Sequence, residues 1–352
     1  MDKEKFFTQV DAAWLEQGPE ADTVISSRIR LARNLDALPF PPAAGKEALH
    51  EVLSQVEAAA KHLPEAKRFH ILELSRLSPL ERQVLIEKHL VSPEHVREAE
   101  GRGVILRDDQ AVSIMINEED HLRIQILLPG LSLLAAWQLA NRLDDSLEQH
   151  LDYAFDKGVG FLTSCPTNVG TGLRASIMLH LPALVLLNQA GQVFTTLAQL
   201  GAVVRGLYGE GTQALGNYFQ ISNQLTLNHA EEDLITTLLG LVNQVIQQER
   251  AARERLYHEL GNRLVDMVWR AYGTLTHARI LSGDEAMKLL SDVRLGVNLN
   301  LLPQVKLTDL NRLLVLTRSG YIQRVAGKEL PAAERDERRA AIVREELTGK
   351  VR

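Results

Sequence analysis

Five arginines stand in short, distinctive contexts along the sequence, and their side chains are suited to binding phosphate. Arg28 and Arg30 are two residues apart in a Ser-Ser-Arg-Ile-Arg segment, so on a β-strand they would share one face. Arg123 follows an acidic turn, Arg174 ends a Gly-rich segment, and Arg205 begins the segment Arg-Gly-Leu-Tyr-Gly-Glu-Gly. A guanidinium fork matches phosphate geometry, and a triphosphate needs several cations or backbone amides. Any one of these residues alone fits an ordinary surface arginine, so only the set is informative.

Three glutamates have the chemistry to act on a guanidinium group. Glu118 and Glu119 stand together in Asn-Glu-Glu-Asp-His, and Glu210 follows far along the chain. A protonated guanidinium, with a pKa above about 12, is a poor nucleophile. Carboxylates can hold it, orient the attacking nitrogen and accept its proton during phosphoryl transfer. The alternative for an acidic run after a strand is a solvated turn.

The single cysteine, Cys165, begins the segment Cys-Pro-Thr-Asn-Val-Gly-Thr-Gly-Leu-Arg. We expect the Gly-rich turn to lead into a helix at about 172–181, so that backbone N–H groups and Thr167 stabilise a thiolate. A thiolate beside a guanidinium would add to the grip of the carboxylates. The alternative is a small buried hydrophobic side chain. One cysteine permits no intrachain disulfide and fits a reducing compartment.

Composition and missing motifs narrow the class of protein. The chain has 352 residues and a formal net charge of −6, which predicts no general attraction to nucleic acid or to anionic membranes. No run of about 18 apolar residues occurs, and the charged first ten residues do not resemble a signal peptide, so we expect a cytoplasmic protein. The Walker A pattern and the protein-kinase motifs are missing from the sequence. If ATP binds, arginines rather than a Walker lysine must hold it.

Hydrophobic periodicity predicts an α+β region followed by a helical region. The predicted strands are 104–106, 112–116, 122–128, 159–164, 193–205 and 218–227. The predicted helices before residue 228 are 46–62, 78–89, 132–150 and 172–181, with Ser78 and Ser132 as N-caps. Beyond Asn228 we expect mainly helices, two of them capped by Ser282 and Thr308. We therefore predict a catalytic domain at 1–255 and an all-α domain at 256–352, with a soft boundary because one helix can run through 247–259.

Four motifs in the same order resemble the phosphagen kinases, which include creatine and arginine kinases. They are the segments 26–30, 117–123, 165–174 and 205–210, and the resemblance covers about residues 20–255. It implies a large antiparallel sheet flanked by helices. It also implies ATP as substrate with Mg²⁺ held mostly by phosphates and water, and no dedicated metal ligand from the protein.

The resemblance also implies a role for each matching residue. Glu119 matches the main catalytic base, Glu210 the second carboxylate that aligns the guanidinium, and Cys165 the reactive cysteine; Glu118 belongs to the substrate motif. The positions that bind the nucleotide phosphates match Arg28, Arg30, Arg123, Arg174 and Arg205.

Two departures from the small-substrate enzymes resemble a bacterial branch that phosphorylates arginine side chains in proteins. Only 25 residues precede Ser26, where the small-substrate enzymes have a helical domain that partly covers the guanidino substrate. A helical region follows instead, with Arg335, Asp336 and Arg339 in an Arg-Asp-x-x-Arg-Ala motif. In that branch the motif forms a separate, stimulatory pocket for phosphoarginine. The alternative is a charged helix face with i,i+3 and i,i+4 pairs.

The resemblance therefore predicts a kinase for arginine in proteins. Its implied partners are a heat-shock repressor and unfolded proteins as substrates, a zinc-binding activator protein and a Clp chaperone–protease that degrades the marked proteins in a stress response. A homodimer or higher oligomer is expected from the apolar helices of the C-terminal region. Two alternatives remain open: a kinase for free arginine or another small guanidine, and a non-catalytic regulator that binds phosphoarginine.

Overall fold

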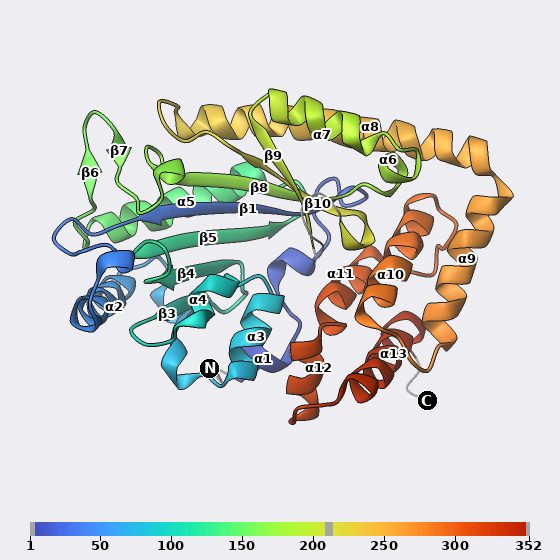
Figure 1. Cartoon of the computed structure of the whole chain (residues 1–352), viewed down its shortest axis with the longest axis horizontal. Coiled ribbons are helices and arrows are strands. Elements are labelled where there is room, and N and C mark those ends of the chain that lie inside the picture. The colour runs from blue at the N-terminus through green and yellow to red at the C-terminus, as the bar shows by residue number, and fades with distance from the viewer. Residues whose placement is uncertain (1–3, 208–213, 350–352) are drawn as a thin grey trace.

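The computed structural model describes residues 4–207 and 214–349, and a large antiparallel sheet forms the centre of its first part (Figure 1). The strand order is β2-β3-β4-β5-β1-β8-β10-β9, and every neighbouring pair is antiparallel. A hairpin of β6 and β7 stands apart from the sheet. The strands are β1 (Val24–Arg33), β2 (Phe69–Glu73), β3 (Gly103–Arg107), β4 (Val112–Ile116), β5 (Leu122–Pro129), β6 (Phe155–Asp156), β7 (Gly160–Phe161), β8 (Leu173–His180), β9 (Ala202–Gly206) and β10 (Tyr218–Asn223).

Helices cover the sheet and form the whole C-terminal part. Those of the first part are α1 (Lys5–Thr8), α2 (Lys46–Ala60), α3 (Pro79–Glu87), α4 (Pro93–Arg97), α5 (Leu133–Glu148), α6 (Pro182–Leu186) and α7 (Ala190–Gln199). The remaining ones are α8 (Glu231–Leu260), α9 (Asn262–His277), α10 (Gly283–Asn298), α11 (Leu307–Leu316), α12 (Ser319–Ala326) and α13 (Ala332–Thr348).

Alternation along the central strands gives the sheet an apolar face and a polar face. In β1, Ile29 and Leu31 are fully buried in a core that also contains side chains of α5 and α8. Arg28 and Arg30 alternate with them and therefore point to the opposite face. Helix α5 contacts β1 and β5, and α8 contacts β8 and β10. The hydrophobic pattern of β1 thus fixes which side is open to polar chemistry.

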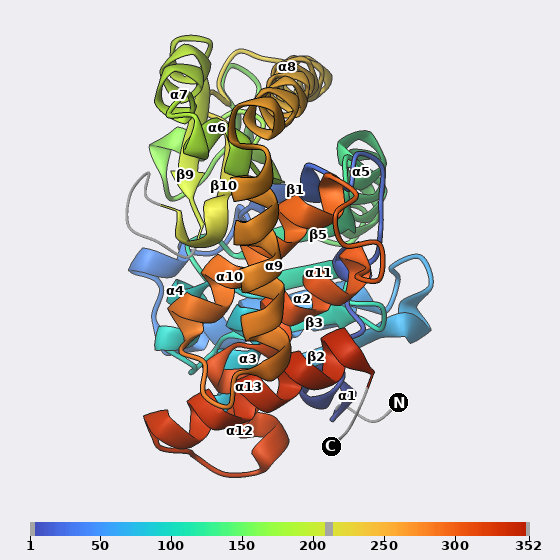
Figure 2. The ribbon, with the colours of Figure 1, turned by 90° about the vertical axis from the view of Figure 1, so that its right-hand side faces the viewer.

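The C-terminal helices pack on one another and on the edge of the first part. Helix α8 runs above the sheet in Figure 1, and α9 turns away from it after Gly261. Helices α9, α10, α11 and α13 share a small core of their own (Figure 2), and α12 lies against α3 and α1 (Figure 1). Residue 255, the predicted domain boundary, lies inside α8, so a single helix does run through 247–259. The division into two domains stays a prediction.

Most predicted elements are confirmed. The three-strand meander from residue 103, helices at 46–62, 78–89 and 132–150, and a mainly helical C-terminal part are all present. Ser78 forms a reciprocal capping box with Glu81, and Ser282 accepts a hydrogen bond from the Glu285 N–H. Ser132 is the N-cap residue of α5 as predicted, but its hydroxyl donates to the Pro129 carbonyl and does not accept a helix N–H. The cap predicted at Thr308 is wrong, because α11 begins at Leu307 after Lys306.

Two further predictions are wrong in element type. The segment predicted as a helix at 172–181 is the central strand β8, in which Arg174, Ser176 and Met178 share one face. Residues 193–205 were expected as a strand but contain the end of α7, followed by β9. The predicted strand 159–164 shrinks to the two residues of β7. In β8 both faces are covered, so its nearly continuous burial obscures the period of two.

No helix within 4–207 and 214–349 is long and apolar enough to cross a membrane.

Candidate active site

Strand register gathers the five predicted arginines on the polar face of the sheet. Arg30 of β1 lies directly opposite Arg174 of β8, and Ala32 lies opposite Arg123 of β5. Residues directly opposite in antiparallel strands point to the same side. Arg28 is two residues before Arg30 on β1 and so points to the same side. Gln220 of β10 lies opposite both Met178 of β8 and Arg205 of β9, so Arg205 also points to this side. Arginines separated by up to 177 positions in the sequence (205 − 28) thus share one surface.

Neutral side chains position these guanidinium groups from neighbouring strands. Arg28 donates to Gln220 Oε1 at 2.6 Å and to Ser176 Oγ at 3.3 Å. Arg174 donates to Ser222 Oγ at 3.3 Å. The Nε atoms of Arg30 and Arg174 are buried and have no hydrogen-bond partner within the described residues. Buried donors are normally satisfied, so these two fit a site for an anion.

The cluster carries more positive charge than its surroundings neutralise. Burial, with the charges of Arg174 and Arg123, lowers the pKa of Arg28 to about 10. Burial and the neighbouring arginines also hold the pKa of Arg30 well below its usual value. The pKa of Arg174 is lowered by burial and then by Arg205 and Arg123. A polyanion bound here would relieve this mutual repulsion.

The acidic turn between β4 and β5 holds Arg123, a member of the arginine cluster, in place. Glu118 Oε2 lies 2.6 Å from Arg123 Nη1, and Glu118 also accepts bonds from the Ser92 hydroxyl and the Glu119 N–H. Burial alone would raise the pKa of Glu118, but Arg123 and these two donors outweigh it and keep that pKa below its usual value. Glu118 is therefore a buried anion that anchors Arg123.

Glu119 is the more accessible of the two carboxylates. Its Oε2 lies 2.9 Å from Arg123 Nη2 and 3.5 Å from Asn168 Nδ2, and 40% of its side chain is exposed. Burial raises its pKa, Arg123 opposes the rise, and the charges of Asp120 and Glu118 add to it. A carboxylate with a raised pKa and an open side is suited to accept a proton.

Cys165 lies in the loop that brings Asn168 to Glu119. Its Sγ is 3.0 Å from Thr167 Oγ1, and the residue is partly exposed. The charges of both Cys165 and Glu119 oppose the lowering of the Arg174 pKa, so the thiol lies within electrostatic range of the arginine cluster. No α-helix begins after this loop, because residues from Leu173 form β8. The expectation that helix N–H groups stabilise the thiolate is therefore wrong, and Thr167 is its described polar neighbour.

Glu210 lies outside the described residues, so its place relative to Glu119 stays a prediction. Arg205 is described, exposed, and close enough to Arg174 to lower the pKa of that residue.

A cavity of about 420 Å³ opens beside the arginine cluster. Arg28, Arg30 and Arg123 line it together with His89 and Gln125, and further polar and apolar side chains complete its wall. Burial, then Arg28 and Arg318, lower the pKa of His89 to about 3, so its imidazole is neutral. The sequence reasoning missed His89, because nothing near it in the sequence marks it. The period of two along 122–128 puts Gln125 on the same face as Arg123.

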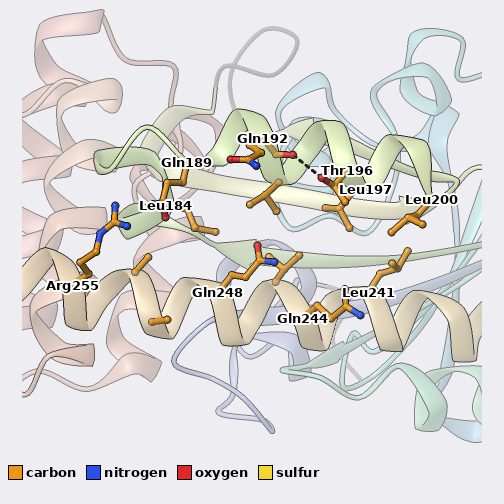
Figure 3. Close-up of a pocket in the computed structure, with 14 residues that line it drawn as sticks. Leu184, Gln189, Gln192, Thr196, Leu197, Leu200, Leu241, Gln244, Gln248 and Arg255 are labelled. Carbon is orange, nitrogen blue, oxygen red and sulfur yellow. Dashed lines mark hydrogen bonds between the residues drawn. The ribbon is translucent and has the colours of Figure 1, made fainter.

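A second cavity, of about 450 Å³, lies between α7 and α8 and differs in chemistry (Figure 3). Leucines and glutamines from the two helices face each other across it, and Arg255 is the one charged residue that the described chain contributes to its lining. A triphosphate needs several cations, so the cavity beside the arginine cluster is the better candidate for a nucleotide.

The C-terminal motif lies on α13. Arg339 is only 2% exposed; it pairs with Asp336 and donates to the carbonyls of Leu281 and Thr317. Arg335 is partly exposed and donates to the Leu330 carbonyl at 3.1 Å. Arg339 thus braces α13 against the start of α12, while Arg335 and Asp336 remain accessible in part. Their predicted role in binding phosphoarginine stays a prediction.

Within 4–207 and 214–349, no group of three or more His, Cys, Asp or Glu residues could hold a metal ion.

Comparison with known proteins fits this geometry. Residues 51–252 match the model of the ATP:guanido phosphotransferase C-terminal catalytic domain, and residues 261–351 match that of the protein-arginine kinase McsB C-terminal domain. A protein-arginine kinase of Symbiobacterium thermophilum is 52% identical over 345 residues, covering 97% of this chain and 98% of its own. One of Desulforamulus reducens is 53% identical over 338 residues, covering 95% of both. The chain belongs to the protein-arginine kinase family.

Solved structures place this protein-arginine kinase family member among phosphagen kinases. Lombricine kinase aligns with a TM-score of 0.59 and 27% identity, covering 69% of this chain and 71% of its own. The duplicated taurocyamine kinase from Schistosoma mansoni aligns with a TM-score of 0.59 and 24% identity, covering 74% of this chain and 39% of its own, which supports the fold alone. The predicted fold class is confirmed, and the chain is a phosphotransferase.

Proposed function

We propose that this enzyme transfers the γ-phosphoryl group of ATP to arginine side chains of substrate proteins. The observation that carries the proposal is the position of Arg123. It belongs to the arginine cluster on the sheet and also pairs with both Glu118 and Glu119. One guanidinium therefore links a surface suited to a polyphosphate with carboxylates suited to a guanidinium substrate.

The phosphate side of the reaction falls to the arginine cluster. Bound phosphates would occupy the face where Arg30 and Arg174 leave buried Nε donors unpaired. Arginine forks fixed in this way neutralise charge that develops in the transition state without reorganising. Mg²⁺, carried in with the nucleotide by phosphate oxygens and water, would supply further charge neutralisation. The proposed phosphate-binding residues are Arg28, Arg30, Arg123, Arg174 and Arg205.

The acceptor side falls to Glu119. A substrate arginine Nη attacks the γ-phosphorus, the bond to the β–γ bridging oxygen breaks, ADP leaves, and the Nη proton passes to Glu119. Asn168, 3.5 Å from Glu119 Oε2, helps to fix that carboxylate. Glu118 holds Arg123, Cys165 remains the predicted reactive thiol near the substrate, and Glu210 the predicted second carboxylate.

The choice of a protein substrate rests on the relatives. Those at about half identity over nearly the whole chain are named protein-arginine kinases, and a C-terminal model specific to that family matches residues 261–351. These matches favour protein arginine over free arginine. We further propose action in the cytoplasm, a stimulatory phosphoarginine pocket at Arg335, Asp336 and Arg339, and a homo-oligomer. The heat-shock repressor, the zinc-binding activator and Clp degradation in a stress response stay predictions.

The test is phosphotransfer to a protein. The chain is incubated with Mg²⁺-ATP and casein at neutral pH, because the P–N bond is acid-labile, and phosphate is located by mass spectrometry. We expect phosphoarginine from the wild type and almost none from Glu119→Gln. Rapid turnover of free arginine with none on casein would refute the protein substrate. A Glu119→Gln variant that loses phosphotransfer but keeps its full biological activity would instead revive the non-catalytic regulator.

A further inference from the structure

The cavity beside the arginine cluster is lined from both parts of the chain. Its wall comes mainly from α3, the segment that follows α3, β1 and β5, but Arg318, between α11 and α12, also lines it. Arg318 Nε donates to the Leu314 carbonyl at 3.1 Å, and its Nη2 lies 3.7 Å from Met287 Sδ. The C-terminal helices therefore contribute a cation to a site otherwise built on the sheet.

The segment that carries Arg318 is held on two sides. The Glu87 carboxylate, at the end of α3, accepts the N–H groups of Gly320 and Tyr321, each at 2.8 Å. On the other side Arg339 of α13 donates to the Thr317 carbonyl at 2.8 Å. Glu87 itself lines the cavity. A side chain fixed between two such anchors is preorganised for a ligand, because little conformational entropy is left to lose.

The lining segment from Glu87 to Ser92 places Arg318 at the end of the cavity remote from Glu119. At one end of this segment the Glu87 carboxylate accepts the N–H of Gly320, two residues after Arg318. At its other end the Ser92 hydroxyl donates to Glu118, the residue next to Glu119. A nucleotide whose γ-phosphate meets Glu119 would therefore extend its nucleoside towards Arg318.

We propose that Arg318 is a nucleotide-binding residue supplied by the C-terminal helices, and that its guanidinium packs against the nucleoside end of ATP. Ile86, next to Glu87, gives this end an apolar side chain, and Val91, Pro93 and Met115 line the cavity elsewhere, so its wall suits a flat apolar ring. A guanidinium stacks well on aromatic faces. This inference rests on the proposed ATP site.

The test compares ADP and inorganic tripolyphosphate by isothermal titration calorimetry. Arg318→Gln is expected to weaken ADP binding roughly tenfold, the size of a partly desolvated cation–π contact, and to leave tripolyphosphate binding unchanged. Arg318→Lys, which keeps the charge but loses the planar fork, is expected to lose part of the ADP affinity. Arg270→Gln is the matched control, because Arg270 is 78% exposed on α9 and forms its ion pair with Asp266 of the same helix. Thermal unfolding of each variant shows that it is folded.

The outcomes separate this inference from the proposed function. If the wild type binds ADP and Arg318→Gln binds it equally well, the inference is wrong and the ATP site stands. An equal loss for ADP and tripolyphosphate would place Arg318 on the phosphates and also overturn the inference. A wild type that binds no ADP would overturn the proposed function, and this inference with it. As an independent readout, the KM for ATP should rise in Arg318→Gln by about the same tenfold.

Discussion

Replacing Glu119 by Gln separates proton transfer from nucleotide binding. The change removes the proton acceptor but leaves Arg123 held by Glu118 at 2.6 Å. Loss of a general base costs about 10²- to 10⁴-fold in rate, which is about 3–5 kcal/mol of transition-state free energy. We therefore expect kcat to fall by that factor while the KM for ATP changes less than about threefold.

Glu118→Gln is the matched comparison because it changes the neighbouring carboxylate by the same single atom. Glu118 holds Arg123 and accepts from Ser92 and the Glu119 N–H, so its loss should loosen Arg123. We expect the KM for ATP to rise about tenfold, the effect of weakening one charge-assisted contact by about 1.4 kcal/mol. Initial rates with Mg²⁺-ATP and casein give both constants.

The pH profile adds a second readout for Glu119. Only the ionised carboxylate can accept a proton, and burial raises its pKa. The rate should therefore decline on acidification at a higher pH than for an ordinary glutamate, and Glu119→Gln should lose this limb of the profile. A Glu119→Gln enzyme within about tenfold of the wild-type kcat would refute the base assignment. An equal rise of the KM for ATP in both variants would refute the division of labour between the two carboxylates.

Three other predictions concern binding, the thiol and stability. Arg174→Met should raise the KM for ATP at least tenfold in steady-state assays, since it removes one fork from the phosphate surface; an unchanged KM would exclude that role. Cys165→Ala should lower kcat, and Cys165→Ser should lower kcat by a smaller factor. Iodoacetamide should inactivate the wild type more slowly when Mg²⁺-ADP and a substrate arginine peptide are present. Equal inactivation rates would contradict a thiol near the substrate. Burial raises the pKa of Glu231 from 4.5 to about 7, so its contribution to stability is fully present below about pH 4.5 and is lost as pH rises through 7. At pH 8 the free energy of unfolding of Glu231→Gln should thus exceed that of the wild type by up to about 3 kcal/mol, measured as a higher unfolding temperature. At pH 4.5 the two should match. A constant difference across pH would show that ionisation is not the cause.

Local pattern was enough to predict the parts of the site that depend on one strand or one turn. The two-residue spacing of Arg28 and Arg30 predicted a shared face, and β1 confirms it. The acidic segment directly precedes Arg123, one of the predicted phosphate-binding arginines. In the structure Glu118 and Glu119 both pair with Arg123.

Features that depend on distant segments escaped the sequence reasoning. The strand β8 is buried on both faces, so its apolar run resembles a helix as much as a strand. Arg28 depends on Gln220, 192 positions away, and no local signal couples them. His89 and Arg318 enter the cavity from the turn after α3 and from the α11–α12 junction, which meet because α12 packs on α3. Such contacts are properties of tertiary packing rather than of periodicity.

The alternation along β1 also bears on how the sheet reaches its correct pairing. A slip of one residue against β5 or β8 would turn Arg28 and Arg30 towards α5 and α8 and would expose Ile29 and Leu31. Two guanidinium groups without partners in an apolar layer would each cost several kcal/mol. The same positive charges that are suited to phosphate therefore penalise each sheet that is misaligned by an odd number of residues, and the chemistry of the site helps to select its own fold.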